Sequence, residues 1–388
     1  MTTTQAFISE HTERVQPLQH QLALAQWEVA TTGSATANAR AAELQRKLMR
    51  IYANAAEYAL VQDWHERAAG DDPHEARILQ RLELAYQGGQ NDERTITALT
   101  EMMKDIRGIY TNFRARYDGR EVSDNTLGEV LRRETDSEKL QEAWEAGKQV
   151  GQQVAGKLRA LARERNLAAQ RKGFANYYQQ SLVLSELSED TVFGLFDELE
   201  RLTREPFRRA KAELDEQLSR RFHVSPGALR PWHYFDPFFQ AWPQLGAANL
   251  DADLRDRDPA ALALRVYDGL GLDVRDILAR SDLYERPGKN QHAFCIDIDR
   301  AGDTRILCNV KHDLRWNGTM LHELGHAVYN RSIDRALPYL LRTPAHSLST
   351  EAIALLMGRL TLNGDWLREI AGLPPAAVEQ LLPLLQRQ

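Results

Sequence analysis

Apolar residues recur at helical spacing along most of the chain, and no other feature of the sequence limits the fold as much. The clearest segment begins at Ser188, a good N-cap, where Glu189 and Asp190 place negative charge on the positive end of a helix. The apolar residues that follow at helical spacing are Val192, Leu195, Phe196, Leu199 and Leu202. Similar patterns predict helices over roughly 8–30, 38–68, 75–87, 94–116, 137–171 and 259–270. The sequence therefore favours a mainly α-helical protein.

Residues 225–243 interrupt the helical pattern. Four prolines prevent a regular helix here, and six of the eleven residues from Trp232 to Trp242 are aromatic. A small cluster packed beside the main core would explain so many aromatic side chains. The alternative is the aromatic wall of a ligand channel.

Residues 291–310 form the second interruption. Two segments rich in β-formers, 293–299 and 304–310, flank a turn that we expect to centre on Ala301 and Gly302. Such a hairpin would place Cys295 directly opposite Cys308, close enough for a disulfide. Two free, buried thiols are the favoured alternative. The predicted fold class is therefore mainly α with one small hairpin.

The composition excludes several classes of protein. The 388 residues, 43% of them hydrophobic, suit two or three domains or one large helical body. A net charge of −6 argues against non-specific nucleic-acid binding. Because the sequence lacks an apolar run of about 18 residues and a secretory signal, we expect no membrane association. With two cysteines in the chain, we predict a cytoplasmic protein.

Residues 316–330 contain the pattern that carries the chemistry. His322 and His326 are four residues apart, so a helix would present both imidazoles on one face, where they can bind one metal ion. Glu323 follows the first histidine, and its carboxylate could reach a water on that metal. An amphipathic helix with two surface histidines is the alternative for this pattern alone.

A catalytic zinc site needs a third protein ligand, and Glu351 is the candidate. It lies 25 residues after His326, which leaves room for a loop holding Pro338 and Pro344 and for a returning helix capped by Ser349 or Thr350. The downstream sequence lacks the positions of a three-histidine site. The predicted ligand set is therefore His322, His326 and Glu351, with one Zn²⁺ per chain.

These residues together resemble the HExxH zinc peptidases (gluzincins) of the angiotensin-converting enzyme and thimet oligopeptidase-like group. Two further segments resemble the same group, namely 165–178 and the aromatic loop that begins at Pro231. The resemblance implies a zincin-like, mainly α, two-lobed peptidase with a small sheet beside the metal helix. It leads us to expect a lid-like region over about 1–120 and a catalytic region over about 121–388.

The resemblance also implies how a substrate binds. Short, unfolded peptides would add to the strand before the metal helix, which corresponds here to His292, Ala293 and Phe294. His292 would donate a hydrogen bond to the peptide, although a polar residue at a strand end is an equal reading. The resemblance does not distinguish internal cleavage from removal of terminal dipeptides, and it leaves the oligomeric state open.

Two departures from the group are visible. The inward positions expected after Glu351 are Ala354, Leu355 and Gly358, none of which can accept a proton from a metal-binding histidine, with Asp313 and Asp334 as weaker substitutes. Only 37 residues follow Glu351, and none is a tyrosine or histidine of the kind that stabilises the oxyanion in the group. This leads us to expect a chain that is C-terminally incomplete or naturally short, with impaired catalysis.

The sequence thus predicts a zinc metallopeptidase that hydrolyses short peptides, with Glu323 as catalytic base. One alternative is a zinc-binding, catalytically impaired helical scaffold. The other, a nucleic-acid-associated helical protein, is disfavoured by the charge.

Overall fold

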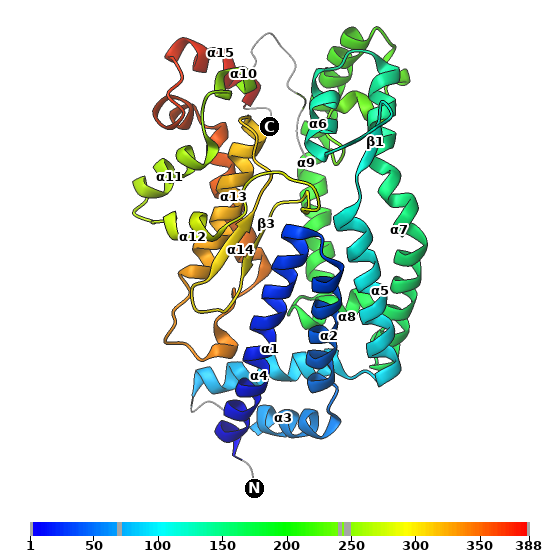
Figure 1. The fold of residues 1–388 in the computed structure, drawn as a ribbon, viewed down its shortest axis with the longest axis vertical. Helices are drawn as coiled ribbons and strands as arrows, with labels where there is room; N and C mark the ends of the chain where they lie inside the picture. The colour runs from blue at the N-terminus through cyan, green and yellow to red at the C-terminus, as the bar shows by residue number, and fades with distance from the viewer. Residues whose placement is uncertain (1–2, 68–71, 240–242, 244–249, 386–388) are drawn as a thin grey trace.

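The computed structural model describes residues 3–67, 72–239, 243 and 250–385. Within them the fold is mainly α, as predicted, with two small antiparallel hairpins. Two columns of helices stand side by side, with α3 and α4 across one end and α1 and α2 between the columns (Figure 1). No helix among these residues combines the length and the apolar character needed to cross a membrane.

The α-helices are α1 (Thr4–Thr32), α2 (Ala35–Tyr52), α3 (Ala55–Arg67), α4 (Pro73–Gly89), α5 (Glu93–Asn112), α6 (Asp124–Arg133), α7 (Ser137–Arg171), α8 (Tyr177–Leu184), α9 (Glu189–Phe222), α10 (Leu250–Leu254), α11 (Pro259–Gly269), α12 (Arg275–Arg280), α13 (Leu314–Arg331), α14 (Ser347–Arg359) and α15 (Pro375–Leu385). The strands are β1 (Ala115–Tyr117), β2 (Arg120–Val122), β3 (Phe294–Asp297) and β4 (Thr304–Leu307). Short helical turns are η1 (Pro226–Ala228), η2 (Pro231–Tyr234), η3 (Tyr339–Leu341), η4 (Leu360–Leu362) and η5 (Trp366–Ile370).

Local capping signals place several helix ends where the sequence predicts them. The Ser188 hydroxyl accepts a hydrogen bond from the Thr191 amide at the start of α9. The prediction of a single helix over 38–68 is wrong, because this segment forms two helices, α2 and α3. The Asn54 side chain accepts hydrogen bonds from the amides of Ala56 and Glu57, which makes it the cap of a new helix.

The hairpin β1–β2 was not predicted, and the helix expected over 94–116 ends instead at Asn112. The turn between β1 and β2 consists of Asp118 and Gly119, with φ of 50° and 72°. This left-handed pair is the geometry of a two-residue hairpin turn, for which Asp-Gly is a strong local signal.

The second hairpin, β3–β4, exists as predicted but in a different register. Cys295 pairs with Ile306, not with Cys308, so the predicted facing thiols are wrong. The turn centres on Arg300 and Ala301, one residue earlier than expected. Arg300 takes a left-handed φ of 55° there, and the Asp299 carboxylate accepts hydrogen bonds from the amides of Ala301 and Asp303. Both cysteines are free; Cys308 is buried and Cys295 is half-buried.

The strand β3 lies at an edge. The backbone of Asp282 exchanges hydrogen bonds with Ile306 and Cys308, so β4 lies between that segment and β3. The Ile298 amide donates to the Asp303 carbonyl across the hairpin. Because antiparallel pairing alternates, the backbone groups of Cys295, and of Ala293 before it, point away from β4.

The largest core cluster surrounds α13, which packs against α11, α14 and both strands of the second hairpin. It is tied to α11 by the buried Tyr267, whose hydroxyl donates to the Leu321 carbonyl at 2.9 Å. A second cluster joins α6, α7 and the C-terminal end of α9. Two smaller clusters hold α1 to α4 together.

Some aromatic side chains of residues 225–243 pack into the core, and others are exposed. Phe235 is buried in the second cluster, with Trp232 and Tyr234 packed against it, which fits the core interpretation. Phe238 and Phe239 are 57% and 59% exposed. Trp242 lies outside the described residues.

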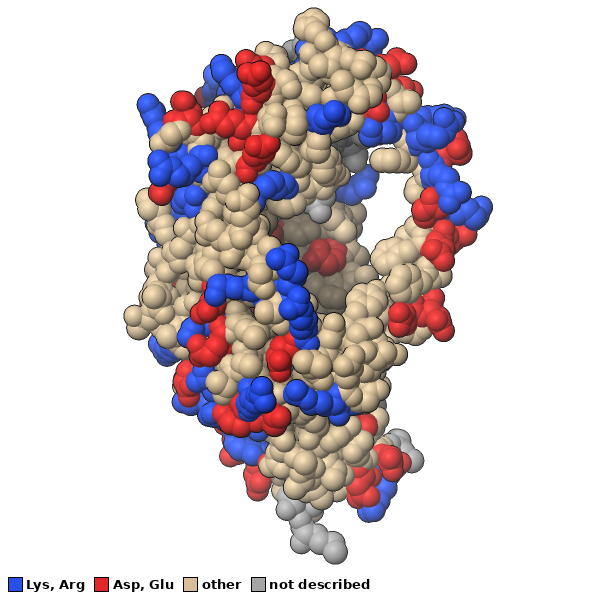
Figure 2. Space-filling model, turned by 90° about the vertical axis from the view of Figure 1, so that its right-hand side faces the viewer, with Lys and Arg blue, Asp and Glu red and all other residues tan. Residues whose placement is uncertain are grey.

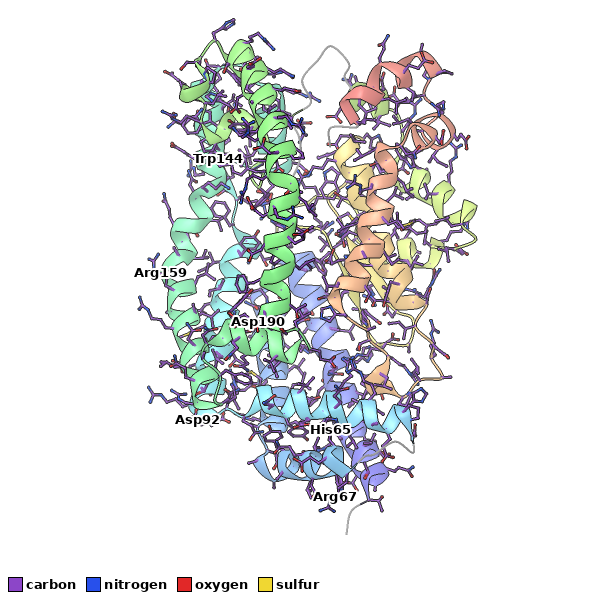
Figure 3. All side chains as sticks on the ribbon, turned by 180° about the vertical axis from the view of Figure 1, so that it is seen from behind. His65, Arg67, Asp92, Trp144, Arg159 and Asp190 are labelled. Atoms are coloured by element: carbon purple, nitrogen blue, oxygen red, sulfur yellow. The ribbon has the colours of Figure 1, made fainter. Side chains whose placement is uncertain are left out.

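The helix α9 stands apart from the packed body over most of its length. Residues 189–209 are exposed except for the half-buried Val192. Seen from behind, α9 runs along the near face, with Asp190 at its lower end (Figure 3). The space-filling view shows a deep hollow with acidic groups inside it, bounded on one side by a slender arch (Figure 2).

Candidate metal centre

The helix α13 fixes two imidazoles on one face. It begins after Asp313, whose carboxylate accepts the Trp316 amide at 2.8 Å, and its other face is buried in the core. The rings of His322 and His326 lie one turn apart, with centroids 4.8 Å from each other and planes at 84°. The side chains are 26% and 14% exposed, so both rings reach the surface of the core from a rigid support.

Small residues let the returning helix α14 approach α13 closely. A Cβ placed on Gly325 would lie 2.9 Å from the Ala354 Cα, and one placed on Gly358 would lie 3.2 Å from the Gly318 carbonyl oxygen. Any larger side chain at Gly325 would push the helices apart. The close crossing brings the Glu351 carboxylate to 3.7 Å from the His322 Nε2 and 3.6 Å from the His326 Nε2.

The predicted start of the returning helix is wrong by about one turn. The helix begins at Ser347, and the His346 side chain caps it by accepting the Leu348 amide. Glu351 therefore lies in the second turn. Its side chain is 53% exposed, so it approaches the histidines from the open side of the site.

The environment favours neutral imidazoles beside a buried carboxyl group. Burial lowers the pKa of His322, as does the neighbouring His326, and burial also lowers the pKa of His326 itself. Glu323 is 7% exposed, and its burial, with a smaller effect of the Glu351 charge, raises its pKa to about 7. A metal ion needs the lone pair of a neutral imidazole, so this environment suits metal binding.

One side chain that contacts the site was missed by sequence reasoning. The Thr350 hydroxyl lies 2.8 Å from the Nδ1 of His326. Of the positions considered instead, Leu355 is 54% exposed and does not point inward, whereas Ala354 is buried against α13. Asp313 caps α13, and Asp334 accepts the amide of Ala336. A hydroxyl within one turn of the third ligand was the signal that could have identified Thr350.

The three residues expected to bind substrate lie at the start of β3. His292 is exposed, and its ring centroid is 5.7 Å from that of Tyr110 and 6.1 Å from that of Phe238. Phe294 pairs with Leu307 and meets Trp27 edge-on. No third strand among the described residues pairs with β3, so the outward backbone groups of Ala293 and Cys295 form an open strand edge.

The donor set and its spacing fit zinc. Two imidazoles and one carboxylate are a common ligand set of catalytic zinc, which leaves a fourth position for water. Tetrahedral bonds of zinc place neighbouring ligand atoms about 3.3 Å apart. The ligand atoms of His322, His326 and Glu351 all lie within 4.8 Å of one another, so small side-chain movements would complete the site.

A mainly α protein with two helix-borne histidines and a glutamate from a returning helix has the arrangement of the gluzincin metallopeptidases. The family model of angiotensin-converting enzyme matches residues 1–205. Since the match covers more than half of the chain, the chain belongs to the angiotensin-converting enzyme family of zinc peptidases. No curated protein matches the chain. The family match ends before α13, so the roles of the site residues rest on geometry and chemistry.

Proposed function

We propose that the protein is a zinc metallopeptidase that hydrolyses short, unfolded peptides. His322, His326 and Glu351 would hold one zinc ion, and Glu323 would act as the catalytic base. The observation that carries the proposal is the convergence of the three ligand side chains on one point beside the buried Glu323. A catalytic site uses a carboxylate at that position, whereas a purely structural site does not.

Each group has a distinct task in this scheme. Zinc would supply an acidified water and a polarised scissile carbonyl. The Glu323 carboxylate accepts a proton from the attacking water and passes it to the departing amine.

The open edge of β3 supports the choice of substrate. An extended peptide can pair with the outward backbone groups of Ala293 and Cys295, and His292 is exposed at the same end, where it could donate a further hydrogen bond. Pairing of this kind reads an extended backbone, which a folded protein does not offer. We therefore expect unstructured peptides to be the substrates.

The experiment measures bound zinc and peptide hydrolysis on the same purified chain. We expect one equivalent of zinc for the unmodified protein and its loss in Glu351→Ala. Glu323→Gln should keep the zinc and lose turnover by roughly a hundred- to ten-thousand-fold, the usual contribution of a general base. The control Asp334→Asn changes an exposed carboxylate in the loop after α13 and should alter neither quantity.

Each other result has a definite meaning. A chain that binds no zinc would contradict the proposal at its centre. Zinc without turnover in the unmodified protein would favour the catalytically impaired scaffold. Full activity of Glu323→Gln would remove the base from the scheme while leaving the metal centre in place.

A further inference from the structure

We infer that Thr350 is a positioning residue that orients His326 for metal binding. This inference rests on the proposed zinc site. It assigns to the chain's own threonine a task that metal sites commonly give to a carboxylate or a backbone carbonyl. Thr350 would touch neither metal nor substrate and would act through the imidazole.

The contact that carries the inference joins two helices. The Thr350 Oγ1 lies 2.8 Å from the Nδ1 of His326, and the Nε2 of the same ring lies 3.6 Å from the Glu351 carboxylate. One nitrogen therefore faces the hydroxyl while the other faces the candidate metal position. Thr350 directly precedes Glu351, so a single turn of α14 supplies both a ligand and the partner of another ligand.

The chemistry of imidazole makes this contact specific. A metal-binding Nε2 must carry a lone pair, so in the neutral ring the proton resides on Nδ1. That N–H can then donate to the Thr350 hydroxyl oxygen, which fixes both the tautomer and the rotation of the ring. Without the hydroxyl, the ring could rotate or adopt the other tautomer, in which Nε2 carries hydrogen and cannot bind zinc.

On α14, the Thr350 hydroxyl is the side-chain group that contacts the Nδ1 of His326. The returning helix carries the buried Ala354 and the small Gly358 against α13, and neither can accept a hydrogen bond through a side chain. The helix itself is held in place at its start, because the His346 ring that caps it also contacts the Ser185 carbonyl at 2.9 Å. The position of Thr350 is therefore set by the packing of α14 and not by the metal.

A hydroxyl is neutral and can donate as well as accept, so it orients a histidine less strictly than a carboxylate does. Loss of such a partner typically costs ten- to a hundred-fold in metal affinity. For Thr350→Val, which keeps the shape of the side chain and removes the hydroxyl, we expect the lower end, about tenfold weaker zinc binding. Thr350→Ser restores the hydroxyl and should bind within about twofold of the original protein.

The test titrates each full-length variant with zinc against a competing chelator and records the thermal unfolding of the metal-free chain. Thr361→Val is the matched control, because Thr361 is a buried threonine in η4, directly after α14, and its hydroxyl donates to the Gly358 carbonyl. It should retain full zinc affinity. If Thr350→Val does not fold, Thr350→Ala takes its place, since alanine is the strongest helix former.

Equal zinc affinity of Thr350→Val and the original protein would overturn the inference. So would a Thr350→Ser variant as weak as Thr350→Val, because that result would assign the effect to packing of the methyl group. If the original protein bound no zinc, the proposed function itself would fail. That outcome is distinct from a zinc-binding protein in which Thr350 has no role.

Discussion

The helices α13 and α9 are both amphipathic in sequence, yet they have opposite environments. Ten of the 18 residues of α13 are buried, whereas three of the 34 residues of α9 are, all near its C-terminal end. The apolar stripe of α9 continues over exposed residues, which include Phe196, Leu199 and Phe207 at 58%, 45% and 63% exposure. The candidate metal ligands come from the packed helix and its neighbour, since tight packing is what holds a side chain in one position.

The largest expected effect compares one leucine from each helix. Leu324 is fully buried in α13, so Leu324→Ala should lower the free energy of unfolding by about 2–5 kcal/mol through lost burial and a residual cavity. Leu199→Ala in α9 should change it by about 0.5 kcal/mol or less, because the side chain is already exposed in the folded protein. Urea unfolding measures both. A cost at Leu199 equal to that at Leu324 would show that the stripe on α9 is covered in solution.

A smaller effect follows from a titratable group in the packed end of the molecule. His11 is fully buried between Tyr52 and Tyr86, and its burial, with the nearby charge of Arg14, lowers its pKa to about 4. The Glu57 carboxylate also faces this cluster. Its burial would raise its pKa, but the hydrogen bonds from Arg14 and Tyr86 lower it instead. The exposed part of α9, residues 189–209, contains no histidine.

The sign of the pH effect follows from the depressed pKa of His11. The unfolded chain binds the histidine proton at pH values below about 6.5, whereas the folded protein resists it until about pH 4. Stability is therefore full above about pH 6.5 and falls by about 3 kcal/mol as the pH drops to 4. Glu57 adds to the loss at lower pH. Urea unfolding over a pH series measures the slope, which His11→Gln should flatten between pH 6.5 and 4; an unchanged slope would exclude His11 as its source.

The comparison of the two helices also shows how far the sequence can predict this structure. Apolar spacing was sufficient for the bounds of α7. The start of α9 at Ser188 was predicted from its cap, which depends on a few adjacent residues. The hairpin register was missed by two residues because the turn centres on Arg300 and Ala301, where the Asp299 carboxylate accepts hydrogen bonds from two loop amides. The exposure of α9 was not predictable from its period, since periodicity identifies an apolar face but not what covers it.

The same limit applies within the candidate metal centre. The spacing of His322 and His326 places them on one face of any helix that contains both, so the sequence was sufficient to predict that they lie side by side. The contact of Thr350 with His326 depends on how α14 crosses α13, and that crossing is set by glycines and alanines whose meeting is a tertiary property. The sequence therefore predicts two histidines that share a helix, but not the atomic contacts that form where two helices cross.

The smallest expected effect has opposite signs in the two helices and compares one glycine from each. Gly325→Ala places a methyl group 2.9 Å from the Ala354 Cα, so α14 must shift, at a cost of about 1–3 kcal/mol. Glu351 would move with α14, and zinc affinity should fall as well. Gly194→Ala lies in open space within α9, where the better helix propensity of alanine should raise stability by about 0.5–1 kcal/mol and leave zinc binding unchanged.

Thermal unfolding and zinc titration of the two variants separate packing from propensity. Because both substitutions gain the same helix propensity, the difference between them reports the contact of α13 with α14 alone. A Gly325→Ala variant as stable as Gly194→Ala, with full zinc affinity, would mean that the two helices are farther apart in solution. The close crossing would then not be what brings Glu351 to the two histidines.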